Sequence, residues 1–483
     1  MYNSIQHFCQ DGIVKLEKIM TDYANDPTKI AEMVYSVTDM VTRLGTDIIA
    51  EEWEKFDEII KKSPERKKQG WYVKDKVETT LITSLGQVTY HKTLYHNKNT
   101  GEYEFLLDRA MGVNPHERIT EDAVARILEE AAVTSYSRGG SNASIRNDVV
   151  SKQTVKNKIH DLQFPDVKPL EKKQVKYLYI DADEDHVALQ FMEHKGDIGK
   201  GTNNTAMPKL AYVYEDVYAE NDVNRLVNCA YFGGIYEGVE GIKEFWNKIN
   251  NYIEASYDVD YLEKVFINGD GAAWIRSGKK YIEKSRFVLD RFHMHKYIIA
   301  ATSHLNDSAE DARSEIYSAI HKKCKWMAEG TFDKIIRITE SESKQRAVEA
   351  SKKYILGNWS GIMEQISNKA AKNECSAEGH ISHVYADRMS SRPLGWSEVG
   401  VDKMAQLRVY HFNKGSMLEL VRLQKKELPM AAGAEEVVLS CAEVYRLERQ
   451  ANTNIRKYAD IPVYSIPKNI RKMLAIRHHL WGL

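Results

Sequence analysis

Apolar residues recur at helical spacing near the beginning of the chain. They follow the i, i+3, i+4, i+7 rule through Ile30, Met33, Val34, Val37, Val41, Leu44 and Ile48. This spacing predicts amphipathic helices over about residues 11–62. Their apolar stripe can pack within a helical bundle or, less commonly, against a second copy of the chain.

Residues 77–109 change to a pattern rich in Thr, Val and Tyr, with a polar turn at 96–101 before EYEFLLD, and we expect a β-hairpin or small meander there.

A helix-turn-helix is predicted next. Thr120 can cap a first helix, whose apolar face consists of Val124, Ile127, Leu128 and Ala131. We expect RGGSN at 138–142 to break this helix and a short helix to follow. Ser151 then caps a helix that turns Val155, Ile159 and Leu162 inward. Its outer face carries Lys152, Gln153, Lys156, Asn157 and His160, side chains suited to phosphates and base edges in a major groove, although an ordinary solvated helix has the same pattern.

From residue 174 onward, short β-type runs alternate with helices. KYLYI, KLAYVY and CAYFGGIY precede a helix at 241–256, and KVFING and RFVLDRF follow. Three strands, a helix, a strand, a helix and a strand is the order of an RNase H-like sheet. We therefore predict an α/β RNase H-like core with an all-α insertion, and divide the chain into 1–70 (N-terminal helices), 71–115 (β-hairpin or meander), 116–165 (helix-turn-helix), 174–300 (first part of the core), 301–365 (helical insertion), 366–415 (last part of the core) and 416–483 (basic C-terminal region).

The charge balance requires any nucleic-acid contact to be local. The chain has 68 Lys and Arg against 69 Asp and Glu, for a net charge of −1. Residues 138–176, however, hold nine basic against four acidic residues, and residues 452–483 hold six against one.

The five cysteines form no Cys-x-x-Cys pair, which argues against a disulfide framework and a structural zinc site. With no signal-peptide pattern and no apolar run of about 18 residues, we expect a cytoplasmic protein without a membrane partner.

Acidic residues follow two of the expected strands. In YLYIDADEDHV the strand is expected to end at Asp181, at the edge of the sheet, with Asp183 close behind; in VFINGDGAAWI the strand ends at Asp270 between two glycines. Each motif alone fits an acidic turn. In one sheet, however, neighbouring strands would place Asp181 and Asp270 side by side, where Mg²⁺ can share their charge. A third carboxylate is expected from Glu378, in the first turn of a helix capped by Ser376, and Glu374 is the alternative.

Histidines follow the last expected strand in DRFHMHKY, at 290–297. His293 and His295 fit core positions, phosphate contacts or proton carriers. A zinc site made of His293, His295, Cys375 and His380 would match no known ligand spacing.

These motifs together resemble the DDE transposases of bacterial insertion sequences, in the branch akin to Mutator-like elements and specifically the ISLre-type family. The resemblance runs from the hairpin to about residue 415 and is carried by YLYIDADEDHV, INGDGAAWI, the Asp-x-x-His of Asp290 to His293, and SAEGHISH…SSRPLGWS…MAQLRVY. It implies that Asp181, Asp270 and Glu378 are the catalytic carboxylates. They would hold two Mg²⁺ ions about 3.5–4 Å apart, with Mn²⁺ able to substitute. Asp183, Asp290 and His293 are accessory candidates.

The resemblance implies an enzyme that cleaves the ends of a mobile element and transfers the strand into target DNA. Its partners would be the terminal inverted repeats, recognised through Lys152, Gln153, Lys156 and Asn157, the target DNA, and a second copy of the chain in a dimer or larger assembly. It would be associated with the nucleoid. Two alternatives remain: a non-transposing nuclease of the same fold, and a DNA-binding regulator whose acidic residues are relics.

Overall fold

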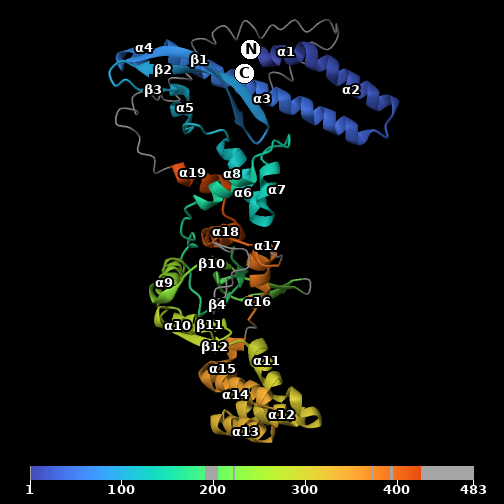
Figure 1. The fold of residues 1–483 in the computed structure, drawn as a ribbon, viewed down its shortest axis with the longest axis vertical. Coiled ribbons are helices and arrows are strands. Elements are labelled where there is room, and N and C mark those ends of the chain that lie inside the picture. Colours follow the sequence, from blue (N-terminus) through green and yellow to red (C-terminus); the bar gives the residue numbers. More distant parts are fainter. Residues whose placement is uncertain (1, 191–204, 221–222, 373–374, 392–394, 426–483) are drawn as a thin grey trace. The chain divides into compact units, whose positions relative to one another are not determined.

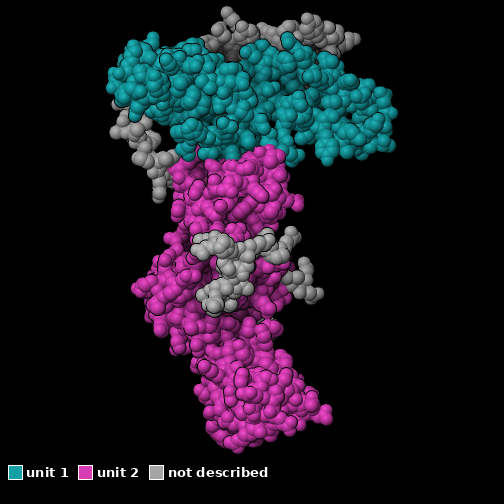
Figure 2. All heavy atoms as spheres, viewed as in Figure 1, with its two compact units in different colours: residues 1–123, 144–148, 427–483 teal, residues 124–143, 149–426 magenta. Residues whose placement is uncertain are grey.

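The computed structural model describes residues 2–190, 205–220, 223–372, 375–391 and 395–425. The described residues form two compact units: residues 2–123 and 144–148 belong to unit 1, and residues 124–143 and 149–425 to unit 2 (Figure 2). Most of the expected basic C-terminal region, including 452–483, lies outside the described residues, as does Glu374.

Unit 1 combines a helical hairpin with a small antiparallel sheet. Its helices are α1 (Asn3–His7), α2 (Ile13–Asn25), α3 (Ile30–Lys62) and α4 (Pro64–Lys68), with a π-helical turn, η1 (Phe8–Gly12), before α2. The strands β1 (Trp71–Ile82), β2 (Gln87–Asn97) and β3 (Tyr103–Glu104) pair in that order, and α5 (Leu106–Met111) follows. Figure 1 shows α3 running along this sheet. The predicted helices and meander are therefore present.

Two features of unit 1 differ from the prediction. The apolar stripe of α3 is only partly covered, because Ile30, Val34 and Val41 are exposed, whereas the later residue Ile60 packs into the core with the strands. The FLLD segment is helical rather than extended. Leu106 and Leu107 are both buried, and consecutive residues cannot point to the same face of a strand.

Three helices occupy the region of the predicted helix-turn-helix: α6 (Glu121–Val133), α7 (Tyr136–Ser141) and α8 (Lys152–His160). The Ser151 hydroxyl caps α8 by accepting a hydrogen bond from the Thr154 N–H at 3.1 Å. The expected break at RGGSN is wrong, since RGGS lies inside α7. Its glycines allow close packing: a Cβ on Gly140 would lie 2.0 Å from the carbonyl oxygen of Val150.

In the described part of unit 2, five strands form one mixed sheet in the order β10-β7-β4-β11-β12. They are β4 (Tyr177–Glu184), β7 (Lys209–Tyr214), β10 (Ala230–Gly234), β11 (Lys264–Gly269) and β12 (Ser285–Leu289). β7 is antiparallel to β4 and β10, whereas β11 is parallel to β4 and β12. Helix α9 (Gly238–Ser256) connects β10 to β11, and α10 (Ala273–Ser277) lies between β11 and β12, so the strands and helices follow the predicted order. Two short pairs accompany the sheet: β5 (Val187–Ala188) with β6 (Thr205–Ala206), and β8 (Val217–Glu220) with β9 (Val223–Leu226).

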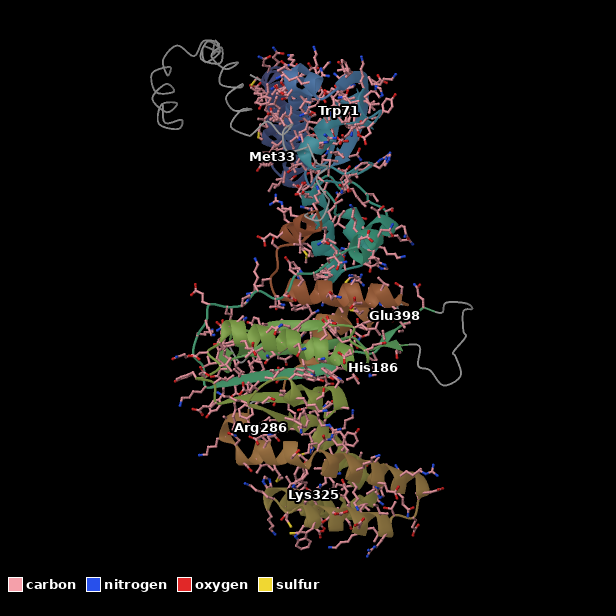
Figure 3. The ribbon with its side chains drawn as sticks, turned by 90° about the vertical axis from the view of Figure 1, so that its left-hand side faces the viewer. Met33, Trp71, His186, Arg286, Lys325 and Glu398 are labelled. Atoms are coloured by element: carbon pink, nitrogen blue, oxygen red, sulfur yellow. The ribbon has the colours of Figure 1, made fainter. Side chains whose placement is uncertain are left out.

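The two faces of this sheet have different chemistry. Ile180 and Ile267 point to the face covered by α9, where they join Trp246 and Ile249 in the largest apolar cluster. The opposite face is largely aromatic and carries Tyr179, Tyr212, Tyr214 and Phe266. In Figure 3, Arg286 near the start of β12 and His186 just beyond β4 mark opposite ends of the parallel strands.

Helices occupy the rest of unit 2. After β12 come α11 (Arg291–Thr302), the 3₁₀ segment η3 (Ser303–Ser308), α12 (Ala309–His321), α13 (Lys325–Ile338), α14 (Glu342–Gly357) and α15 (Trp359–Ser367), so residues 301–365 are helical as predicted (Figure 1). A 3₁₀ turn, η4 (Lys369–Lys372), precedes α16 (Ala377–Ile381), which continues through a π-helical turn, η5 (Ser382–Ala386), into α17 (Asp387–Met389). The last described helices are α18 (Glu398–Phe412) and α19 (Met417–Lys425). Among the described helices, none is both long and apolar enough to cross a membrane.

Candidate active site at the carboxyl ends of parallel strands

Asp181 lies in the middle of β4 and not at the edge of the sheet. It pairs with Tyr212 of β7 on one side and Asn268 of β11 on the other, and its exposed fraction is 0%. The expected strand end at Asp181 is wrong because pairing with β7 continues as far as Glu184. The next residue on the same face, Asp183, is therefore nearer to the end of the strand.

Both carboxylate oxygens of Asp181 accept hydrogen bonds from buried donors. The Tyr214 hydroxyl (3.1 Å) and the Asn268 amide (2.7 Å) donate to Oδ1. The Tyr212 hydroxyl and the Ser376 N–H, both at 2.9 Å, donate to Oδ2. Burial raises the pKa of Asp181, whereas these hydrogen bonds oppose the rise. Asp181 therefore joins three strands to the residue that precedes α16.

Ser376 precedes α16 as predicted, but its hydroxyl does not cap the helix. The hydroxyl instead lies 2.7 Å from the Tyr212 hydroxyl and 3.4 Å from Asp181 Oδ2. The Ser376 hydroxyl, which the sequence pattern assigned to capping, thus interacts with polar groups of the sheet instead. The beginning of α16 is consequently fixed to the sheet.

Three aspartates lie at the same level where β4, β11 and β12 end. Asn268 pairs with Asp181, so continuing this register by two residues places Asp270 level with Asp183. In the same way, the pairing of Gly269 with Leu289 places Asp270 level with Asp290. Residues at one level of neighbouring parallel strands face the same side, so these aspartates lie at one end of the sheet. The structure thus brings Asp270 beside Asp183, with Asp181 two residues behind.

The charges of this end of the sheet influence one another. Burial is the main cause that raises the pKa of Asp183 to about 6, and the negative charge of Asp270 adds to it, while His293 opposes it. The pKa of His293 is raised, first by its hydrogen bond to Asp290 at 2.8 Å and further by the charges of Asp290, Asp270 and Asp183. Four ionisable groups therefore lie within electrostatic reach of one another.

Local backbone geometry holds Asp270 and Asp290 in place. Asp270 Oδ1 accepts the Ala272 N–H at 2.8 Å, and its carbonyl oxygen accepts the Tyr354 hydroxyl. Asp290 caps α11 by accepting the Phe292 N–H at 3.2 Å, while its own N–H donates to the Gly269 carbonyl at 2.9 Å. The glycine before Asp270 permits a close approach, because a Cβ there would lie 2.9 Å from the carbonyl oxygen of Ala182.

The third predicted carboxylate stands apart from this group. Glu378 lies in the first turn of α16, as predicted, and its side chain is exposed. Across the described ranges, no three His, Cys, Asp or Glu side chains gather as a metal-binding group, so Glu378 does not join Asp183 and Asp270 here. The same finding shows that the four zinc-site candidates are not gathered. His380 instead packs against Tyr212, with ring centroids 4.3 Å apart and the rings tilted by 32°, and is hydrogen-bonded to the Tyr231 hydroxyl.

A divalent cation nevertheless fits the donors present at the strand ends. Mg²⁺ in proteins takes hard oxygen ligands and commonly uses only one or two carboxylates, with water or substrate oxygens in its other positions. Asp183 and Asp270 supply two carboxylates. The negative charge of Asp270 helps to raise the pKa of Asp183, and a bound cation would relieve this repulsion. The residues that would hold it are therefore Asp183 and Asp270.

Helix α8 keeps the residues proposed to contact DNA on its outer side. Lys152, Gln153 and Asn157 are exposed and Lys156 is half-buried, while the Gln153 side chain donates to Asn157 Oδ1 at 2.9 Å. The residues just after this helix contact α18, because Lys403 of α18 donates to the Leu162 carbonyl at 2.7 Å. Contact between these side chains and DNA stays a prediction.

Two buried arginines secure the neighbouring helix α6, and the sequence pattern did not identify them. Arg408 donates to the carbonyl of Ala132, and also to those of His383 and Val384. Arg388 donates to the carbonyl of Ala131 at 3.1 Å. Because the last carbonyls of a helix lack partners within it, these cations complete the carboxyl end of α6.

The chain has clear relatives. Residues 23–427 match the family described as Uncharacterised protein family (UPF0236). UPF0236 protein TTE2489 of Caldanaerobacter subterraneus subsp. tengcongensis is 37% identical over 454 residues, which cover 93% of each chain. UPF0236 protein TTE0610/TTE0881/TTE1053/TTE2432 of the same organism is also 37% identical, over 93% of this chain and 92% of its own. A third relative from that organism, whose name joins eleven locus labels beginning with TTE0033, is 36% identical over 86% of this chain and 84% of its own. On the extent of this match, the chain belongs to the uncharacterised protein family UPF0236.

Proposed function

We propose that this protein is a DDE-type DNA transposase, which uses Mg²⁺ to cut the ends of a mobile element and join them to target DNA. One observation carries the proposal. Asp183 and Asp270 lie at the same level near the carboxyl ends of neighbouring parallel strands, and each lies within reach of the other's charge. Cutting and joining DNA are phosphoryl transfers, in which carboxylates commonly hold the divalent cation that the reaction uses.

The sheet around these carboxylates supports the proposal. Its strands and helices follow one another along the chain in the order expected of an RNase H-like catalytic core, and β11 and β12 lie parallel to β4. In open α/β sheets, functional groups collect beyond the carboxyl ends of the parallel strands. The three aspartates lie at that end.

Asp183 takes the place of Asp181 as the first metal-binding carboxylate in this proposal. Both oxygens of Asp181 are occupied by buried hydrogen-bond donors, whereas Asp183 lies beside Asp270 and has its pKa raised to about 6. When bound, the cation would lower the pKa of an attacking water or DNA 3′-hydroxyl and stabilise the leaving oxygen. Asp183 and Asp270 orient that chemistry by their fixed positions at the strand ends.

Asp290 and His293 act on the DNA phosphate. Asp290 fixes the imidazole ring through the hydrogen bond to Nδ1 and raises the pKa of His293, which favours the positively charged ring. A charged ring beside the two carboxylates is suited to donate a hydrogen bond to a phosphate oxygen. Glu378 is the third carboxylate of the proposal, and it would approach Asp270 in the DNA complex.

The relatives add support of another kind. One relative's name joins eleven locus labels of a single organism, and another's joins four. A protein that copies or moves its own gene accounts for such repetition. Because transposition joins two ends of an element, the active form in this proposal is a dimer or larger assembly, with α8 reading the terminal repeats.

The test uses a labelled DNA duplex that carries the genomic sequence flanking the gene on both sides. The wild-type protein is expected to nick this duplex and to form joined products when Mg²⁺ is present. Asp183→Asn, Asp270→Asn and Glu378→Gln should bind the duplex but neither cut nor join it. Asp260→Asn is the matched control, since Asp260 is an exposed carboxylate just before β11, at the other end of the sheet.

Each other outcome has a defined meaning. Cutting without joined products would favour the non-transposing nuclease. Binding without cutting by the wild-type protein would favour the DNA-binding regulator and contradict the proposal. If only Glu378→Gln remains active, the third carboxylate is another residue, with Glu374 the next to test.

A further inference from the structure

The turn between α12 and α13 combines exposed positive charge with an exposed indole. We define the basic turn as residues 321–326, HKKCKW; all of them except Cys324 are exposed. Trp326 has an exposed fraction of 76%, and it is the one exposed tryptophan in the part of the chain that the structure describes. Figure 3 labels Lys325, the first residue of α13, within the helical insertion.

No carboxylate interrupts this positive charge. The sequence has no Asp or Glu between Glu315 and Glu329. Both flanking carboxylates lie near other lysines: Glu315 is 3.7 Å from Lys334, and Glu329 is 3.2 Å from Lys352. The three lysines of the basic turn thus keep a local charge of +3 that suits a polyanion.

The backbone of the basic turn adds to this preference for anions. α12 ends with the Cys324 N–H donating to the Ala319 carbonyl at 2.9 Å, and Lys323 has a φ of +56° at a position that usually takes glycine. A lysine therefore stands where glycine, which has no Cβ, would be less strained. The next helix, α13, has no acidic residue in its first turn, and Cys324 makes no side-chain cap. Its uncapped N–H groups face the same region and favour negative charge.

The helix surface beside the indole is open. One turn after Trp326, position 330 is glycine, and a Cβ there would meet no atom within 4 Å. An aromatic ring exposed in this way offers a flat face on which a nucleic-acid base can stack, because every base has a π-face. Lysines beside such a ring follow the backbone of the same strand.

We propose that the basic turn binds a DNA strand, with Trp326 stacking on an unpaired base and the lysines holding the neighbouring phosphates. The inference rests on the proposed function only in its choice of DNA as the nucleic acid. It assigns to the helical insertion a role that the carboxylates at the strand ends do not perform: holding DNA that has lost its pairing.

The test measures binding without cleavage, by fluorescence anisotropy in EDTA. Two labelled duplexes are compared, one fully paired and one with a single looped-out thymine. The full-length protein should bind the looped-out duplex more tightly, and Trp326→Ala should weaken that binding roughly 5- to 150-fold, the range for loss of one stacked base. Trp326→Phe keeps an aromatic face and should retain most of the preference.

Charge-matched variants test the lysines. Replacing Lys322, Lys323 and Lys325 together by Gln should reduce the slope of log affinity against log salt by about 2 to 3 on both duplexes. The control replaces Lys15, Lys18 and Lys67, exposed lysines of unit 1, and should leave the preference for the looped-out base unchanged.

Two results would overturn the inference. One is equal binding of the two duplexes by the wild-type protein or an unchanged preference in Trp326→Ala. The other is a change of sedimentation mass in Trp326→Ala with DNA binding intact, since that would assign the indole to a protein contact. A protein that prefers the looped-out base but never cuts DNA would refute the proposed function and leave this inference standing.

Discussion

Asp181 offers the sharpest separation between a structural and a metal-binding role. Replacing it by alanine leaves the Tyr214 hydroxyl, the Asn268 amide and the Ser376 N–H without their acceptor. The Tyr212 hydroxyl keeps a partner, because it also lies 2.7 Å from the Ser376 hydroxyl. Each abandoned buried donor costs about 1–3 kcal/mol. Three of them would cost roughly 3–9 kcal/mol. The alanine variant no longer has to bury a carboxylate, and burial of this carboxylate is unfavourable, as its raised pKa indicates. This gain offsets part of the loss.

We therefore expect Asp181→Ala to lower the free energy of unfolding by about 4 kcal/mol. Asp181→Asn keeps the shape and one acceptor oxygen, and should cost about 1–2 kcal/mol. Urea denaturation followed by circular dichroism measures both values. Hydrogen exchange at α16 measures the local effect, and should accelerate in Asp181→Ala because the bond from the Ser376 N–H is lost.

The metal site provides the contrast. If Asp181 only positions α16 and the strands, Asp181→Asn retains part of the cleavage activity that Asp183→Asn loses. Two results would refute this reasoning. One is a wild-type stability for Asp181→Ala. The other is a stable Asp181→Asn protein in which Mg²⁺ binding is lost as completely as in Asp183→Asn.

Three further predictions concern stability. Burial lowers the pKa of His380 to about 4, so the unfolded chain takes up a proton first, and stability should fall by about 3 kcal/mol as the pH drops from 6.5 to 4. The urea midpoint of the wild-type protein should fall across this pH range, and that of His380→Gln should fall less. Gly140→Ala forces a Cβ against the Val150 carbonyl and should cost about 3 kcal/mol, whereas Gly330→Ala, which meets no neighbour, should be neutral or slightly stabilising; equal melting temperatures would contradict this. Arg408→Met removes the donors to three backbone carbonyls and should cost about 3 kcal/mol by urea denaturation, against little for exposed Arg286→Met; a wild-type midpoint for Arg408→Met would refute the role given to it.

Local patterns in the sequence predicted what local chemistry determines. The strand that leads into Asp270 and the cap at Ser151 were both foreseen, because glycines, capping residues and apolar periodicity act over a few residues. The order of strands and helices in unit 2 followed from the same patterns. They could not show which aspartate of DADED reaches the end of the strand, since this depends on how far β7 pairs with β4.

Features that depend on distant partners were missed. Tyr212 and Tyr214 alternate within KLAYVY, which places both on one face of β7. Buried hydroxyls on that face require an acceptor, and Asp181 is that acceptor. The two tyrosines were therefore the feature of the sequence from which the buried position of Asp181 could have been predicted. Arg388 and Arg408 gave no comparable signal, because the carbonyls that they complete lie more than 250 residues away in α6. The RGGS segment was misread for a related reason: its glycines serve tight packing, which only the folded neighbours define.

The central claim is that Asp183 and Asp270 together hold a divalent cation at the end of the parallel strands, and binding of Mn²⁺ in place of Mg²⁺ tests it most directly. Electron paramagnetic resonance of free Mn²⁺ needs no knowledge of the DNA sequence and gives the affinity at pH 7.5, where Asp183, with a pKa of about 6, is ionised. We predict that Asp183→Asn and Asp270→Asn each weaken the tightest binding at least tenfold, while Asp260→Asn binds as the wild type does. Equal affinity in all four proteins, or loss of binding only in Asp181→Asn, would contradict the account.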